Sequence, residues 1–177
     1  MPVQEVVPSA LAESGKREDD QKSSSEISVL LARFREGRKK ENVMAKIPKE
    51  VQEFFPGKLA WVATATKDGV PNVTPKGSLR VLDDQHVVFA DLFSLKTRSN
   101  LAENPQVAVT VVDQGTFSGY QLKGTAEMIS SGPLYDELSA QVKARMPHLP
   151  SPNYVVKIAV QAVYDQSAGA SAGKQIA

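Results

Sequence analysis

Six short runs of apolar and β-branched residues follow one another between residues 59 and 165, and they limit the possible folds more than any other feature of the sequence. Val, Ile and Thr favour extended backbone, and clusters of Gly, Pro, Asp and Asn between the runs favour turns. Short turns between successive runs are typical of antiparallel strands. The predicted strands are residues 59–66, 72–82, 86–91, 106–113, 120–130 and 153–165.

Helical segments accompany these strands at residues 48–55, 94–104 and 132–146. The second of them ends at Asn104, because the following Pro105 disfavours helical geometry in the residue before it. The order of elements predicts an α+β fold that is mainly β, a small six-stranded antiparallel barrel rather than a doubly wound parallel sheet. A barrel of that size fills its interior with side chains, so we expect a ligand to bind on the outside or at a subunit interface.

The ends of the chain differ in composition from the predicted barrel domain of residues 46–165. Residues 1–25 are rich in Ser, Pro and charge and have no aromatic side chain, so we predict a flexible arm. Residues 26–45 carry apolar side chains at helical spacing and are predicted to form an amphipathic helix extension. Its apolar stripe needs a partner, which could be the main domain, a second subunit or another protein. Residues 166–177 form a small, polar C-terminal tail.

Composition excludes several classes of function. The formal net charge is +1, from 21 basic and 20 acidic residues, so no excess of basic charge points to nucleic acid. The chain has no cysteine, which excludes disulfides, thiolate nucleophiles and cysteine metal sites. It has no apolar run long enough to span a membrane and no signal-peptide pattern, so we expect a cytoplasmic protein.

The usual catalytic and metal-binding motifs are also missing. The sequence contains no G-x-S-x-G, no Walker A motif and no G-x-G-x-x-G. His86 and His148 are far apart in the chain and lack the spacing of a helical zinc motif, so we expect no metal site.

Polar and basic residues gather in two places instead. Ser94, Lys96 and Thr97 stand at the start of the predicted helix 94–104, where they could bind an anion or simply cap the helix. In the segment VTPKGS, alternation places Thr74, Lys76 and Ser78 on one face of their strand. If neighbouring strands bring the two clusters together, they form a candidate site for a polar ligand.

The segment from residue 64 to residue 113 resembles the pyridoxamine 5′-phosphate oxidase-like FMN-binding split-barrel superfamily, especially its small FMN-binding and flavin reductase-like members. The resemblance lies in the order of its motifs: a hairpin with an Asp-Gly turn, a strand before VLDD, and Lys-Thr opening a helix that ends in ENP. It extends over about residues 46–165. It implies a split barrel, bound FMN, and a homodimer whose two flavin sites lie across the interface.

The resemblance also implies roles for individual residues. It assigns the FMN phosphate to the start of the helix and the ring and ribityl chain to two strand ends. Residues at the start of the predicted strand 120–130 would reach the flavin of the partner subunit. The implied cofactor-binding residues are Lys96, Thr97, Ser94 and Asn100 for the phosphate, Thr74, Pro75, Lys76, Gly77, Ser78, Ala90, Asp91 and Leu92 for the ring and ribityl chain, and Tyr120 and Gln121 for the partner's flavin.

Departures from the pattern bear on the reaction. Pyridoxamine-phosphate oxidases proper carry an Arg-Lys pair where this chain has Lys96 and Thr97, and a C-terminal segment rich in Trp and Arg where this chain is small and polar. General flavin chemistry is therefore expected: an FMN-dependent oxidoreductase that passes hydride or electrons through a non-covalent flavin, with a small-molecule substrate or a redox partner. The alternatives are a non-enzymatic flavin-binding electron carrier, and a split barrel that binds deazaflavin F420 or haem.

Overall fold

The structure, a computed structural model, describes residues 43–177. The predicted arm 1–25 and nearly all of the predicted helix extension 26–45 lie outside the described residues. No helix within residues 43–177 is long and apolar enough to cross a membrane. The helices are Lys49–Phe54 (α2), Leu95–Glu103 (α3) and Pro133–Arg145 (α4), and the strands are Ala60–Ala65 (β1), Pro71–Lys76 (β2), Arg80–Val81 (β3), His86–Asp91 (β4), Gln106–Asp113 (β5), Ser118–Ile129 (β6) and Tyr154–Asp165 (β7).

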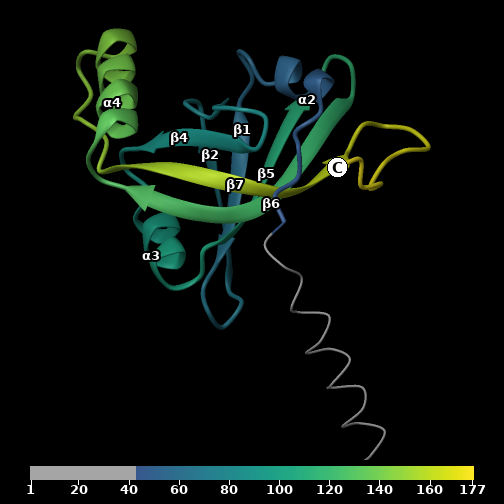
Figure 1. The fold of residues 1–177 in the computed structure, drawn as a ribbon, viewed down its shortest axis with the longest axis horizontal. Coiled ribbons are helices and arrows are strands. Elements are labelled where there is room, and N and C mark those ends of the chain that lie inside the picture. The colour runs from purple at the N-terminus through teal and green to yellow at the C-terminus, as the bar shows by residue number, and fades with distance from the viewer. Residues whose placement is uncertain (1–42) are drawn as a thin grey trace, which may run out of the picture. The chain divides into compact units, whose positions relative to one another are not determined.

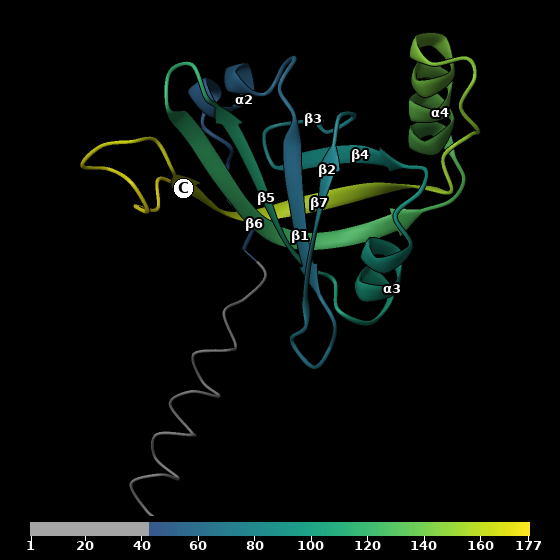
Figure 2. The same ribbon diagram turned by 180° about the vertical axis from the view of Figure 1, so that it is seen from behind.

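All strands belong to one antiparallel sheet with the order β2-β1-β5-β6-β7-β4-β3. The two edge strands, β2 and β3, are consecutive in the chain, so the link 77–79 crosses from one edge of the sheet to the other. Figures 1 and 2 show the sheet strongly curled, with α2 at one end and α3 and α4 at the other. The predicted mainly β split-barrel fold with short helices is confirmed.

The predicted number of strands was wrong, because the single strand expected at 72–82 is two strands and the sheet of the described residues has seven. The chain turns at Gly77 and Ser78, and Leu79 then enters the core with 7% of its surface exposed. A straight strand through these residues would keep Arg80 on the β2 edge. The turn carries it to β4 instead, where it lies opposite Val88.

β4 is buried along nearly its whole length because it contributes to two hydrophobic clusters. Val87 and Phe89 point into the main core inside the curled sheet. Val88 and Ala90 alternate to the outer face, where α4 covers them. The face of α4 that makes this contact carries Leu138 and Val142, as the predicted helix 132–146 required.

Gly124 marks an irregularity where β6 passes β7. The pairing register shifts between Lys123 and Gly124, which is the signature of a β-bulge. A Cβ built on Gly124 would lie 2.1 Å from the carbonyl oxygen of Ala159, far inside a van der Waals contact. The position therefore requires glycine, as its place inside a strand pattern indicated.

The C-terminal tail folds back along the end of β7. β4 pairs with residues 154–159 of this strand, and the tail pairs with residues 163–165. The Ile176 N–H donates to the Val163 carbonyl oxygen at 2.8 Å, and the Val163 N–H donates to the Ala177 carbonyl oxygen at 2.8 Å. The Asp165 N–H donates to the carbonyl oxygen of Lys174. The tail thus satisfies backbone groups that would otherwise form an open sheet edge.

Candidate functional site

Lys76, Asp91 and Ser94 form a buried polar cluster where the ends of β2 and β4 meet the start of α3. The Nζ of Lys76 lies 2.5 Å from Oδ1 of Asp91, and it also donates to the hydroxyl of Ser94. Only 7% of Lys76 and 1% of Asp91 are exposed. We call these three residues the Lys76 cluster.

The fold brings the Lys76 cluster together from distant parts of the sheet. Lys76 ends β2 on one edge, whereas Asp91 ends β4 beside the other edge, so the pair forms only because the sheet curls. The Lys76 ammonium also lies 5.1 Å from the centre of the Phe89 ring, within cation–π range. A buried ammonium with this set of partners is a fixed positive charge rather than a flexible surface lysine.

α3 is attached to β1 and β2 by a second group of polar side chains, which are buried or half-buried. Asn72 Nδ2 donates to the hydroxyl oxygens of Thr64 and Thr97, each at 3.2 Å. The hydroxyls of Thr74 and Thr97 are 3.2 Å apart, and Asn100 Nδ2 donates to the Thr64 hydroxyl at 3.1 Å. These five residues are the α3 network. Thr97 and Asn100 therefore face the sheet, and their side chains already have protein partners.

Among residues 43–177, no side chain caps the N-terminus of α3. Ser94 occupies the N-cap position, but its hydroxyl accepts from Lys76 and makes no capping hydrogen bond. The side chain of Lys96 is exposed, and among the described residues it forms no ion pair. The Leu95 N–H donates to the Phe93 carbonyl oxygen at 3.0 Å, and the remaining N–H groups of the first turn, together with a nearby ammonium, favour an anion at this place.

The remaining residues predicted on the two strands lie around the same junction. Ser78 bridges to β4, because its hydroxyl donates to the Ala90 carbonyl oxygen at 3.1 Å and accepts from the Ala90 N–H at 3.1 Å. Pro75 and Gly77 are exposed on either side of Lys76, and Leu92 follows Asp91 at half-buried exposure.

Tyr120 and Gln121 have other surroundings. The Tyr120 ring packs edge to face on Phe54 of α2, with ring centres 5.1 Å apart. Burial raises the pKa of the Tyr120 hydroxyl, and the negative charges of Asp165 and Glu50 raise it further. Gln121 lies between Thr110 and Tyr164 in the sheet. Within one chain, the structure does not bring these two residues to the Lys76 cluster.

The family assignment follows from comparison with known sequences. The model of the pyridoxamine 5′-phosphate oxidase family matches residues 47–167, which include the whole sheet and both polar groups. The chain belongs to this family.

Within this family, the chain is similar to an uncharacterized protein of Methanocaldococcus jannaschii. It is 38% identical over 137 residues, which cover 76% of this chain and 90% of the relative. The crystal structure of HupZ from Group A Streptococcus is 30% identical with a TM-score of 0.64, covering 72% of this chain and 99% of HupZ. An FMN-binding protein from Syntrophomonas wolfei shares the fold at 13% identity and a TM-score of 0.58, covering 80% of this chain and 97% of that one.

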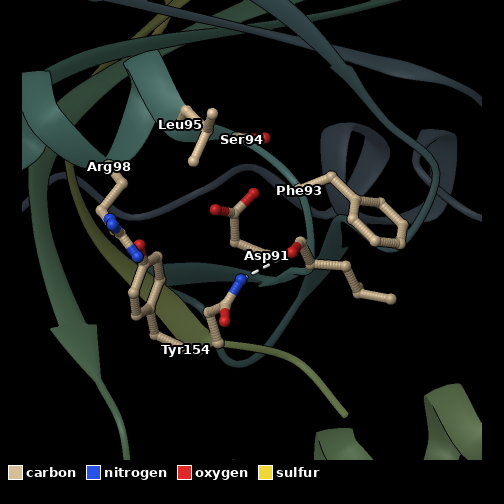
Figure 3. A pocket seen from close by; sticks show the side chains of 8 residues that line it. Asp91, Phe93, Ser94, Leu95, Arg98 and Tyr154 are labelled. Atoms are coloured by element: carbon tan, nitrogen blue, oxygen red, sulfur yellow. Dashed lines mark hydrogen bonds between the residues drawn. The ribbon is translucent and has the colours of Figure 1, made fainter. Parts of the chain in front are cut away.

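A cavity of about 240 Å³ opens beside the Lys76 cluster, between the start of α3 and the start of β7. Figure 3 shows the Arg98 guanidinium lying against the Tyr154 ring, with Phe93 on the far side of the cavity. Arg98 is centred 5.9 Å from that ring. The residues that line the cavity are Asp91, Leu92, Phe93, Ser94, Leu95, Arg98, Asn153 and Tyr154.

Several residues of the α3 network and of the cavity were not predicted from the sequence. Asn72 was detectable, because it stands two positions before Thr74 and so shares its face of the strand. Thr64 and Arg98 gave no such signal. Asn153 and Tyr154 join the site only through the pairing of β7 with β4, in which Tyr154 lies opposite Asp91.

Proposed function

We propose that this chain binds FMN without a covalent bond at the junction of β2, β4 and α3 and works as an oxidoreductase that passes hydride or electrons. The observation that carries the proposal is the convergence of Lys76, Asp91 and Ser94 from three separate segments of the chain. The family of the chain supports the proposal, as does the shared fold of the FMN-binding protein from Syntrophomonas wolfei.

The residues at this junction fit the chemistry of FMN. The uncapped start of α3 and the exposed ammonium of Lys96 would hold the phosphate, since both favour an anion. The hydroxyl of Thr97 is occupied by β2, so this residue would contribute its backbone N–H group and the placement of α3. Bound FMN supplies one- and two-electron redox chemistry.

Lys76 would contribute a positive charge to the ring. Its ammonium is held by Asp91 and Ser94, so it needs no reorganisation to act on a developing negative charge. Asp91 offsets part of that charge, and the two residues together would set how strongly the site favours the anionic reduced flavin. The chain's own part in the reaction is therefore to fix the ring and its electrostatic surroundings.

We further propose that a second copy of the chain covers the outer face of β2, β1 and β5. Trp61 lies opposite Pro75 and Thr110 on this face, and Val73 and Val112 share it. The exposed fractions of Trp61, Val73 and Val112 are 43%, 56% and 46%. A sheet face with this much exposed apolar surface is typical of a protein interface. Gln121, which pairs with Thr110 on this face, would then lie near the partner's flavin, whereas the Tyr120 ring packs on Phe54 at the opposite face of the sheet.

The first test is the absorbance spectrum of the purified full chain, with mass identification of any released cofactor. Flavin absorbance and the mass of FMN would support the proposal, whereas haem or deazaflavin F420 would replace the cofactor assignment. Reduction by NADH or NADPH with turnover of an acceptor supports an enzyme; reduction without turnover supports an electron carrier.

The phosphate assignment has its own test. Substituting Lys96→Ala should weaken FMN binding, measured by quenching of flavin fluorescence. Lys67→Ala, in the exposed turn between β1 and β2, is the matched control. An unchanged FMN affinity in Lys96→Ala would contradict the assignment.

A further inference from the structure

The cavity beside the Lys76 cluster shares Asp91, Leu92 and Ser94 with the proposed FMN site, but its other lining residues have no part in FMN binding as proposed above. It is lined by a cation at one end, Arg98, and by the aromatic rings of Phe93 and Tyr154. Phe93 and Leu95 expose 67% and 74% of their surfaces, so the apolar wall continues out to the surface. A cation next to exposed aromatic surface suits a ligand that is part anion and part apolar.

Arg98 is held in place and still available to a ligand. Its guanidinium is stacked within cation–π range of Tyr154, which restricts its orientation. Among residues 43–177 it has no carboxylate partner. The planar guanidinium can therefore offer its edge to a carboxylate in two parallel hydrogen bonds.

The remaining charges at the cavity do not cancel that of Arg98. Asp91 contributes the carboxylate on the wall, but its charge is matched by the Lys76 ammonium 2.5 Å behind it. The three groups together carry one net positive charge at neutral pH. An anion that enters beside Arg98 is therefore attracted despite the presence of Asp91.

The volume limits the size of the ligand. Drug-sized ligands occupy pockets of about 300–1,000 Å³, so a cavity of about 240 Å³ is too small for a flavin nucleotide. A dry cavity of about 150 Å³ holds benzene in another protein, so the cavity beside Arg98 suits one substituted ring. Asn153 is held at the wall of the cavity, because Asn153 Nδ2 donates to the Leu92 carbonyl oxygen at 2.6 Å, the contact drawn in Figure 3.

We propose that this cavity is a substrate subsite for a small aromatic carboxylate. Arg98 binds the carboxylate, and the ring packs between Tyr154 and Phe93, next to the Lys76 cluster. The proposal rests on the proposed function only in treating the bound acid as a substrate of the flavin site. The binding of the acid itself needs no flavin.

Calorimetric titration of benzoate into the full chain tests the proposal, with benzyl alcohol as the neutral probe of the same shape. Benzoate should bind at least about tenfold more tightly than benzyl alcohol, as a charge-assisted pair of hydrogen bonds requires. Arg98→Gln should abolish this preference and Tyr154→Leu should weaken benzoate. Arg145→Gln, an exposed arginine at the end of α4, makes the same change in charge outside the cavity and should leave benzoate binding unchanged.

Three results would overturn the subsite: equal affinity for benzoate and benzyl alcohol, benzoate binding unchanged by Arg98→Gln, or displacement of benzoate by equimolar inorganic phosphate. A separate measurement of FMN affinity gives a fourth result that would overturn it. If Arg98→Gln weakens FMN and benzoate together, the guanidinium belongs to the cofactor phosphate and the subsite assignment is wrong. If the chain binds benzoate through Arg98 but no FMN, the proposed function fails and the carboxylate site stands.

Discussion

Lys76 Nζ and Asp91 Oδ1 are 2.5 Å apart in the interior of the protein, and this ion pair joins the last residue of β2 to the last residue of β4. No strand pairing connects these two strands, which lie five places apart in the sheet order. Side chains therefore close this seam of the curled sheet, and a ligand at the seam would contact both ends of the sheet at once.

Removing one partner of this pair should destabilise the protein strongly. Lys76→Met leaves the Asp91 carboxylate buried without a counter-charge, and we expect the free energy of unfolding to fall by about 3–5 kcal/mol. Urea unfolding at neutral pH measures the loss. The double substitution Lys76→Met with Asp91→Leu should recover most of it, because it removes both buried charges. A single variant as stable as the parent would show that the pair is solvated.

Gly124→Ala should be destabilising because of the close approach of β6 to β7. The added methyl group would lie 2.1 Å from the Ala159 carbonyl oxygen, which is backbone and must shift. We expect a cost of about 1–3 kcal/mol, the usual range for overpacking, measured by thermal unfolding. Gly169→Ala, where a Cβ meets nothing within 4 Å, is the control and should change little.

The α3 network predicts a specific loss at Thr97. Thr97→Val keeps the shape of the side chain but removes the hydroxyl that contacts Asn72 and Thr74. The free energy of unfolding should fall by about 1–3 kcal/mol, since two polar side chains lose a partner in a half-buried setting. Amide hydrogen exchange should accelerate in α3 before β5 or β6. Thr97→Ser should keep the parent's exchange rates, and uniform acceleration across the sheet would contradict the assigned role.

Acid should loosen the C-terminal tail through Asp165. Hydrogen bonds from the Ser171 side chain and then from Ser167 hold the pKa of the Asp165 carboxyl below its usual value. A lowered folded pKa contributes stability above the unfolded pKa of about 3.9, and this contribution is lost as the pH falls through the folded pKa.

Asp165→Asn should therefore lower the melting temperature at pH 7 and make little difference near pH 2. Exchange of the Ile176 amide, which bonds to Val163, should respond in the same way. Asp68→Asn removes the same charge from the exposed turn between β1 and β2 and is the control. An equal effect of Asp165→Asn at both pH values would exclude its carboxylate as the cause.

Charge on the outer sheet face should separate the proposed dimer. Trp61→Lys places an ammonium in the centre of that face, and light scattering coupled to gel filtration should show a shift from dimer to monomer. Met146→Lys, at the end of α4 and 37% exposed, is the matched control. A parent chain that is already monomeric at micromolar concentration would rule out the interface.

Local sequence patterns determined most of the secondary structure. The helix predicted at 94–104 is Leu95–Glu103, and the strands predicted at 86–91 and 106–113 are β4 and β5 without change. These elements were predictable because each depends on its own alternation of residues and on a boundary signal such as Pro105. The requirement for glycine at position 124 was visible for the same reason.

Relationships across the sheet were not predictable in this way. The expected strand 72–82 contains the turn at Gly77 and Ser78, but nothing local shows that the chain leaves one sheet edge for the other there. The partner of Lys76 depends on the same crossing. The sequence also could not show that Thr97 faces β2 rather than solvent, or that Tyr154 brings an aromatic wall to Arg98, since both depend on three-dimensional packing.

The crossing at residues 77–79 has a consequence for how the barrel assembles. Because the two edge strands are neighbours in the chain, the loop that closes the sheet contains only the three residues between Lys76 and Arg80. The entropy lost on closing a loop grows with its length, so bringing the edges together is inexpensive once β1 to β7 have paired. Cleaving the chain within this link would leave every strand pair intact, but β2 and β3 would lose their covalent connection, and side-chain contacts such as the Lys76–Asp91 ion pair would have to hold the barrel closed.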